Sequence, residues 1–163
     1  MEFELKIKNG HLMVYEVDVN YRKYLEQFEA KVSQKDSRKF YGIIIKKDEH
    51  EYCIPFTSKV KHRNSKLTIN IKNKGSVIAQ LLLNNMIPVI EEQIKLVEIE
   101  KEKYSDYLKS EIIYLTNKKV INEIITKVSN VFTVLENKKH IDYNFFKSIC
   151  CDFNKLEKIY KKY

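Results

Sequence analysis

The sequence predicts an α+β fold: a compact antiparallel β-barrel core, a short N-terminal helix and a long helical C-terminal half. Short apolar runs recur through residues 1–90, and one pair of them flanks Asn9-Gly10, which is a strong hairpin signal. From residue 91 onward the apolar residues follow the 3.6-residue period of helices instead. This change of period divides the chain into a mainly barrel part, residues 1–90, and a helical cover, residues 91–163.

The barrel part is read as strands interrupted by one helix. Asp18 or Asn20 can cap a short helix that carries apolar and aromatic residues at helical spacing from Tyr21 to Phe28. Pro55 places the end of its strand at a sheet edge or a bulge, because proline cannot donate to a central ladder. The predicted strands cover residues 3–8, 12–17, 40–45, 51–56, 67–71, 76–83 and 86–90.

The helical cover is read as three helices. Thr116-Asn117 separates two apolar stripes and marks the boundary between the first two. The last helix is expected to run from about Tyr143 to Tyr160. We expect residues 1–163 to form a single domain, since this length suits one ordinary domain and not two.

Composition excludes several classes of protein. No apolar run approaches the roughly 20 residues that a membrane span requires. The N-terminus has no basic stretch followed by an apolar one, so we expect a cytoplasmic protein with no membrane partner. The three cysteines have neither zinc-site nor Cys-x-x-Cys spacing and are expected to be ordinary thiols.

The positive charge is concentrated in one stretch. The chain has 30 Lys and Arg against 22 Asp and Glu, a net charge of +8. Between Tyr52 and Ile90 there is no acidic residue, and the same stretch holds six cations. A solvated face usually mixes both signs, so a one-sign stretch indicates a polyanionic partner, of which nucleic acid fits strands better than a membrane does.

Common catalytic constellations are absent from the sequence. The three glycines are far apart and form no phosphate-binding loop, and no histidine pair lies at i, i+4. No Asp/Glu cluster falls near the basic stretch, which argues against two-metal nuclease chemistry. We therefore expect no metal and no cofactor.

RNA can be cleaved without a metal because its 2′-hydroxyl can attack the adjacent phosphate. The protein then needs to align the attack, stabilise charge on the phosphorane and assist proton transfer. Residues 57–62, Thr-Ser-Lys-Val-Lys-His, supply hydroxyls and cations just past the strand that contains Pro55. From the pattern alone this segment is either a phosphate cradle or an ordinary polar loop.

Several ordered blocks resemble the ToxN/AbiQ family, the toxins of type III toxin–antitoxin systems. The resemblance covers about residues 12–90. Residues 91–163 resemble the family only in their general helical character. The blocks are Lys31-Val32, residues 38–45 (Arg-Lys-Phe-Tyr-Gly-Ile-Ile-Ile), residues 52–58 (Tyr-Cys-Ile-Pro-Phe-Thr-Ser), Lys61-His62 and residues 85–89 (Asn-Met-Ile-Pro-Val).

The resemblance implies a metal-independent endoribonuclease with a barrel similar to that of the MazF and CcdB toxins. Such an enzyme cleaves single-stranded, A-rich RNA to a 2′,3′-cyclic phosphate and a 5′-hydroxyl. It also implies a small RNA antitoxin, made as a tandem repeat and folded as a pseudoknot, which the toxin processes and which inhibits it. The implied setting is abortive phage infection or plasmid maintenance, and the implied assembly is a toxin–RNA complex of several protomers.

The resemblance also assigns catalytic positions. Thr57 and Ser58 match the family's Thr-Ser pair, and Arg38 stands where relatives carry a basic residue, often Lys. Lys59 or Lys61 is the basic residue after the pair; relatives often have Pro at the position of Lys59. An arginine is a poor general base, so Arg38 is expected to stabilise charge, and the base is another group or solvent.

The remaining RNA-binding residues are predicted from charge and aromatic character. Tyr21 and Tyr41 are expected to be exposed and to stack on bases, whereas Tyr24 is expected to pack under the first helix. The other predicted RNA-binding residues are Lys31, Lys39, His62, Arg63, Lys66, Lys72 and Lys74.

Two other functions fit the same sequence. A basic RNA-binding module without catalysis would track a nucleic-acid backbone, and cleavage in EDTA would distinguish it from the nuclease. An interaction protein whose long helices dock a partner would lack strongly salt-dependent RNA affinity.

Overall fold

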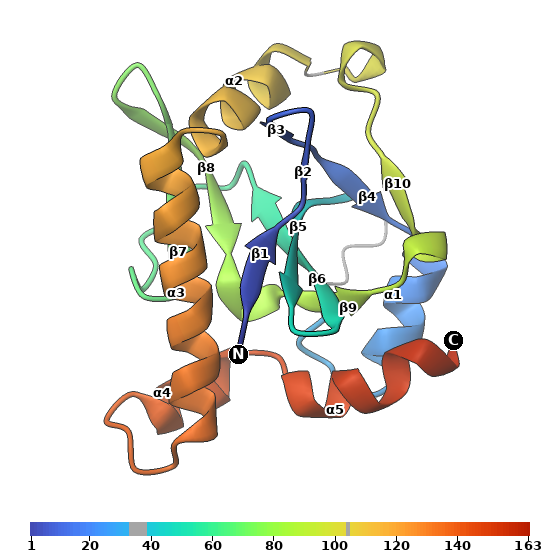
Figure 1. The fold of residues 1–163 in the computed structure, drawn as a ribbon, viewed down its shortest axis with the longest axis vertical. Coiled ribbons are helices and arrows are strands. Elements are labelled where there is room, and N and C mark those ends of the chain that lie inside the picture. Colours follow the sequence, from blue (N-terminus) through green and yellow to red (C-terminus); the bar gives the residue numbers. More distant parts are fainter. Residues whose placement is uncertain (33–38, 104) are drawn as a thin grey trace.

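The computed structural model describes residues 1–32, 39–103 and 105–163 (Figure 1). Over these ranges the α+β class predicted from the sequence is confirmed. The strands are β1 (Phe3–Leu5), β2 (Ile7–Lys8), β3 (His11–Leu12), β4 (Tyr15–Val17), β5 (Phe40–Lys47), β6 (His50–Thr57), β7 (Thr68–Asn73), β8 (Ser76–Leu82), β9 (Ile87–Val89) and β10 (Ile94–Leu96). The helices are α1 (Val19–Glu26), α2 (Ser105–Leu115), α3 (Lys118–Glu136), α4 (Tyr143–Ile149) and α5 (Phe153–Ile159), with 3₁₀ turns η1 (Leu83–Asn85), η2 (Glu91–Gln93), η3 (Ile99–Lys101) and η4 (Tyr160–Lys162).

The hairpin of β5 and β6 is the centre of the main sheet. The two strands pair over residues 42–47 of β5, whose other edge pairs with β4 near its start and with β1 near its end. The outer edge of β6 is divided in the same way between β9 and β8. The main hydrogen-bonded path is β10-β4-β5-β6-β8-β7, and all the pairings described are antiparallel.

The expected closed barrel is not found in the part of the chain that the structure describes. There the path ends at β10 on one side and at β7 on the other, and these two strands do not pair. The reason lies in the centre: each long strand divides its outer edge between two partner strands. The sheet therefore branches on both sides instead of curling round to rejoin its first strand.

Local sequence signals set several of the element boundaries. Asn9 and Gly10 have positive φ angles of 53° and 78°, as the predicted tight turn between β2 and β3 requires. The Asp18 carboxylate accepts the backbone N–H of Tyr21 at 3.0 Å and caps α1. The Asn117 side chain caps α3 in the same manner, which confirms the predicted break between the two helices.

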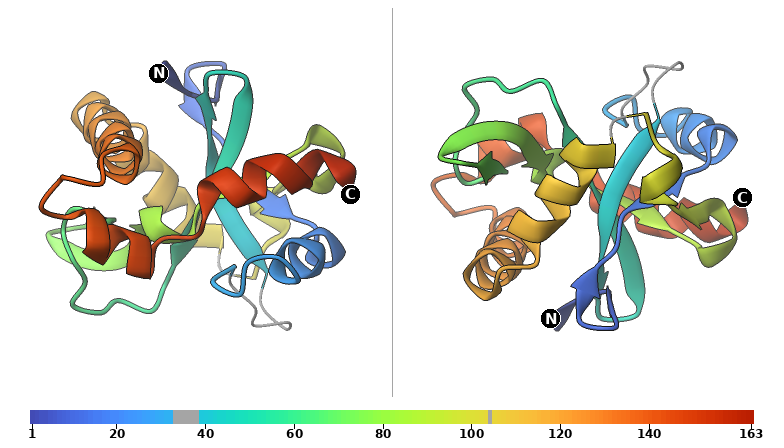
Figure 2. Two further views of the ribbon diagram at one scale, coloured as in Figure 1. Left: turned by 90° about the horizontal axis from the view of Figure 1, so that it is seen from below. Right: turned by 90° about the horizontal axis from the view of Figure 1, so that it is seen from above.

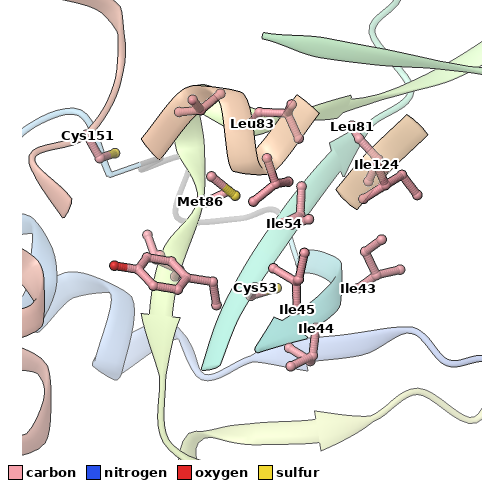
Figure 3. Close-up of a cluster of buried hydrophobic side chains, with 14 of the residues drawn as sticks. Ile43, Ile44, Ile45, Cys53, Ile54, Leu81, Leu83, Met86, Ile124 and Cys151 are labelled. Carbon is pink, nitrogen blue, oxygen red and sulfur yellow. The ribbon is translucent and has the colours of Figure 1, made fainter. Parts of the chain in front are cut away.

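The core lies between the central hairpin and the helices, and three consecutive isoleucines of β5 contribute to it (Figure 3). Ile43, Ile44 and Ile45 are fully buried. Gly42 lets β6 approach closely: a Cβ atom there would lie 2.3 Å from the backbone oxygen of Ile54. The hairpin is thus rigidly packed just where β5 begins and β6 ends.

Helices enclose this sheet on several sides. Figures 1 and 2 show α2 and α5 at opposite ends of the molecule and α3 running between those ends on one side. Among the described residues, no helix has the length and apolar character needed to cross a lipid bilayer.

Two expectations for residues 91–163 are wrong in detail. The region is not helical throughout, because residues 94–96 form β10 and pair with β4. The last helix is also not continuous from Tyr143 to Tyr160. It stops at Ile149 and restarts at Phe153, because the backbone N–H of Cys151 donates to the carbonyl of Asn84 at 2.9 Å and Asp152 caps a new helix.

A polar cluster fastens α5 to the turn end of the β5–β6 hairpin. Glu157 of α5 accepts hydrogen bonds from Lys47 Nζ, at 2.8 Å, and from the Tyr52 hydroxyl. His50 Nδ1 lies 2.8 Å from the Tyr160 hydroxyl. Burial opposes ionisation of Glu157, but the hydrogen bonds from Lys47 and Tyr52 outweigh it, so the net shift of the Glu157 pKa is downward.

Candidate active site

A small pocket opens at the other end of the hairpin, where β5 begins and β6 ends. Its volume is about 190 Å³. Five of the described lining residues are cations and none is a carboxylate. The lining residues are Arg22, Lys39, Phe40, Tyr41, Pro55, Phe56, Thr57, Lys59, Lys61, Arg63, Leu82 and Asn85. We call this site the hairpin pocket; its charge suits an anionic ligand.

The pocket gathers several of the predicted catalytic residues. Thr57, Lys59 and Lys61 all line it, and the Thr57 hydroxyl accepts the backbone N–H of Lys59 at 3.1 Å. Ser58 is exposed on the loop beside the pocket, and its carbonyl accepts the N–H of Val60. Arg38 lies outside the described residues.

Gln80 of β8 holds the loop that follows β6. This side chain is only 3% exposed. Its Oε1 atom accepts the backbone N–H of Lys61 at 3.1 Å and the Nε–H of Arg63 at 2.9 Å. Its Nε2 atom donates to the carbonyl of Lys61 at 2.8 Å and to the side-chain oxygen of Asn70 at 2.9 Å. One buried amide thereby holds the backbone of Lys61 and the guanidinium of Arg63.

Lys39 and Tyr41 reach the pocket from the start of β5, and Glu102 lies beside them. The Tyr41 hydroxyl donates to Glu102 at 2.7 Å, and Lys39 Nζ lies 3.5 Å from the same carboxylate. Lys39 Nζ is also 5.9 Å from the centre of the Tyr41 ring. Burial, followed by the hydrogen bond to Glu102, raises the pKa of Tyr41 to about 12, so its hydroxyl is protonated at neutral pH.

The prediction that Tyr21 is exposed is wrong. Tyr21 is fully buried, and its hydroxyl donates to the carbonyl of Pro88 at 2.6 Å. Tyr21 and Leu25 form the face of α1 that packs inward, so the Tyr21 ring is not available to stack on a base. The packing expected for Tyr24 is found: its hydroxyl donates to the carbonyl of Ile159.

The other predicted RNA-binding residues lie at different places. Arg63 lines the hairpin pocket, and His62 is exposed on the same loop. Lys66 forms an ion pair with Asp142 at 2.6 Å. Lys31 Nζ contacts the carbonyls of Lys147 and Cys150 near the end of α4.

Lys72 and Lys74 belong to the hairpin of β7 and β8. Both are exposed, and neither lines the pocket.

Sequence reasoning missed Arg22, Gln80 and Glu102 at or beside the pocket. Gln80 left one signal, because it is the single polar residue within the apolar run of residues 77–83. Arg22 and Glu102 left none, since each meets the pocket only through the fold.

Acidic and metal-ligating side chains are not clustered here. Over the described ranges there is no group of three or more His, Cys, Asp or Glu side chains that could hold a metal ion. The residues that line the hairpin pocket can align a phosphate, donate a hydrogen bond from a hydroxyl and stabilise negative charge.

Comparisons with known proteins identify the family of the chain. The family model for Toxin ToxN of type III toxin–antitoxin systems matches residues 13–161. Endoribonuclease ToxN of Bacillus thuringiensis subsp. kurstaki is 30% identical over 158 residues, which cover 90% of this chain and 81% of the relative. Endoribonuclease AbiQ of Lactococcus lactis subsp. lactis is 28% identical, covering 95% of this chain and 91% of AbiQ.

Solved structures share the fold. A toxin structure reported for the selective inhibition of a bacterial type III toxin by a non-coding RNA pseudoknot has a TM-score of 0.83 and 29% identity, covering 94% of this chain and 98% of that one. The structure of AbiQ, described as a lactococcal anti-phage endoribonuclease, has a TM-score of 0.73 at 23% identity and shows the fold alone. From the match over residues 13–161 and the identity to the curated relatives, this chain belongs to the ToxN family of toxins of type III toxin–antitoxin systems.

Proposed function

We propose that the protein is a metal-independent endoribonuclease toxin that cleaves single-stranded, A-rich RNA in the hairpin pocket. One observation carries the proposal: Thr57 and five cations converge on a pocket of about 190 Å³ in a chain of the ToxN family. Two relatives are named endoribonucleases. A cationic pocket with a hydroxyl suits a reaction whose charge grows on a phosphate.

The reaction needs no nucleophile from the protein. The 2′-oxygen of the RNA forms a bond to phosphorus while the bond between phosphorus and the 5′-oxygen breaks. The proton of the 2′-hydroxyl passes to a base or to solvent, and the leaving 5′-oxygen gains a proton. The products are a 2′,3′-cyclic phosphate and a 5′-hydroxyl.

Each residue of the proposed site has a role in this reaction. Lys59, Lys61 and Arg63 stabilise the charge that grows on the non-bridging oxygens, and Arg38 is proposed to do the same. Thr57 and Ser58 donate hydrogen bonds to the phosphate. Tyr41, which stays protonated at neutral pH, offers a partly exposed ring against which a base can stack.

The proposed partner is a small RNA antitoxin, encoded as a tandem repeat and folded as a pseudoknot. A related toxin of known structure is described as inhibited by a non-coding RNA pseudoknot. The acid-free stretch of residues 52–90 gives this chain a surface that can bind a folded RNA. We further propose an assembly of several toxin protomers with the antitoxin, and a role in abortive phage infection or plasmid maintenance.

The test is cleavage of an A-rich, single-stranded RNA by the purified protein with EDTA present throughout. We expect full activity and fragments that end in a 2′,3′-cyclic phosphate, identified by mass spectrometry. Activity that EDTA abolishes and magnesium restores would overturn the metal-independent mechanism. Tight binding of the RNA without any cleavage would instead favour a non-catalytic RNA-binding module.

A further inference from the structure

Arg22 is a buried cation that reaches the hairpin pocket from α1. It is only 5% exposed, yet it lines the pocket. Lys61 and Arg63 approach from the loop after β6, so Arg22 adds a positive charge from a separate element. Its guanidinium carbon lies 5.2 Å from the centre of the Phe40 ring, a contact that orients the guanidinium plane.

Burial of the Arg22 guanidinium costs free energy, because it removes a charged group from water. Arginine stays protonated in proteins, so α1 places a full positive charge within the fold. The guanidinium lies near the Cys53 thiol: burial raises the pKa of that thiol, and the Arg22 charge lowers it by a smaller amount. A guanidinium at the wall of the pocket can donate charge-assisted hydrogen bonds to an anion that enters it.

A second cavity adjoins the first at the same residue. It has a volume of about 480 Å³ and shares Arg22 and Lys39 with the hairpin pocket. Glu16, Asp18 and Glu92 line this second cavity. Arg22 thus lies between a cavity with carboxylates and a pocket lined by cations, and a purely structural role would be to balance those carboxylates.

We infer that Arg22 binds the scissile phosphate in the hairpin pocket, from the side of α1. The planar guanidinium of Arg22 can donate two parallel hydrogen bonds to two non-bridging oxygens of the phosphate. Lys61 and Arg63 then neutralise the phosphate charge from the loop after β6. The inference rests on the proposed ribonuclease function and adds to it a phosphate-binding residue on a different element.

The variant Arg22→Met tests the inference, because methionine keeps an apolar stem of similar length without the charge. Removing one partner from buried polar contacts costs stability, so we expect the variant to melt somewhat below the wild-type temperature, and cleavage is measured below both melting temperatures. We expect kcat to fall roughly 10²-fold, the scale of losing one transition-state donor, with KM little changed. Arg22→Lys should recover part of this loss.

Lys23→Met is the matched control, since it removes one positive charge from an exposed position of the same helix. It should cleave RNA at close to the wild-type rate. A folded Arg22→Met protein with wild-type kcat and KM would overturn the inference and leave Arg22 with a structural role. An equal loss in Lys23→Met would also overturn it, because net charge would then explain the effect.

A second measurement uses the wild-type protein and does not depend on cleavage. The chain has three arginines, so their side-chain Nε–Hε NMR signals can be assigned by single Arg→Lys variants. We expect a 2′-O-methyl oligoadenylate, which cannot be cleaved, to shift the Arg22 signal. An unmoved Arg22 signal at saturation would overturn the inference. Failure of the wild-type protein to cleave RNA would overturn the proposed function. The NMR experiment does not depend on cleavage, so it tests the role of Arg22 separately from the proposed function.

Discussion

The two ends of the β5–β6 hairpin carry basic side chains in opposite electrostatic settings. At the turn end, Lys47 forms a hydrogen-bonded ion pair with Glu157, which fastens α5 to the sheet. At the other end, five cations line a pocket in which none of the described lining residues is a carboxylate. Positive charge thus supports folding at the turn end of the hairpin, whereas at the other end it gathers around a pocket from α1, from residue 39 just before β5 and from the loop after β6.

The partners of a basic residue therefore say more about its role than the number of charges in its stretch of sequence, and in the pocket Lys39 is itself paired with Glu102. Lys66 belongs to the acid-free stretch of the sequence, yet Asp142 of a distant segment pairs with it. Lys31 caps the end of α4. The buried amide of Gln80 instead holds the backbone of Lys61 and the Nε–H of Arg63 beside the pocket.

The largest expected effect at the pocket end comes from Ser58→Ala. The lost hydroxyl is proposed to donate to the scissile phosphate, so cleavage should fall roughly 10²-fold or more. Single-turnover cleavage of an A-rich RNA measures the loss, and a thermal melt checks the fold. Ser65→Ala, at another exposed position of the same loop, is the control and should cleave normally. A Ser58→Ala protein that melts and cleaves like wild type would remove Ser58 from the site.

A smaller effect is expected from Gln80→Leu, which keeps the side-chain volume but loses all four hydrogen bonds of the amide. The loop should then sample other conformations, and cleavage should fall about tenfold because Lys61 and Arg63 are no longer held in place. Asn70→Ala removes only the contact between Gln80 and β7 and should have less effect. Equal rates for wild type and a folded Gln80→Leu protein would show that the amide does not position the cations.

Glu157→Gln should affect the turn end alone, lowering stability by about 1–3 kcal/mol at neutral pH without changing the cleavage rate. Because the folded-state pKa of Glu157 is lowered, its ionised form stabilises the fold above the ordinary carboxyl pKa. That contribution is lost as the pH falls through the folded-state pKa. The difference in melting temperature between wild type and variant should therefore shrink in acid. A constant difference across this pH range would contradict the assignment of the stability to the ionised carboxylate.

Much of the fold could be predicted because its signals are local. The Asn9-Gly10 turn and the caps at Asp18 and Asn117 depend on neighbouring residues, and each lies where the sequence indicated. The missed features depend on distant partners. β10 is three residues long and exists through its pairing with β4, and the break before α5 involves a hydrogen bond from Cys151 to Asn84.

The candidate site divides in the same way. Thr57, Lys59 and Lys61 are neighbours in the chain, so a short motif could bring them into one prediction. Arg22 and Gln80 reach the same pocket from α1 and β8, and only tertiary structure joins them to it. Tyr21 lies four residues before the buried Leu25, so both residues are on the same inner face of α1. The helical spacing in the sequence is therefore consistent with a buried Tyr21.

The most direct test of the account compares one lysine from each end of the hairpin. The single-turnover cleavage rates of Lys61→Met and Lys47→Met are measured on the same RNA at one ionic strength, below both melting temperatures. We predict that Lys61→Met cleaves at least about tenfold more slowly while it melts like wild type. Lys47→Met should cleave at the wild-type rate and melt at a lower temperature. Equal cleavage by the two variants, or a greater loss in Lys47→Met, would contradict the assignment of the hairpin pocket as the site of RNA cleavage.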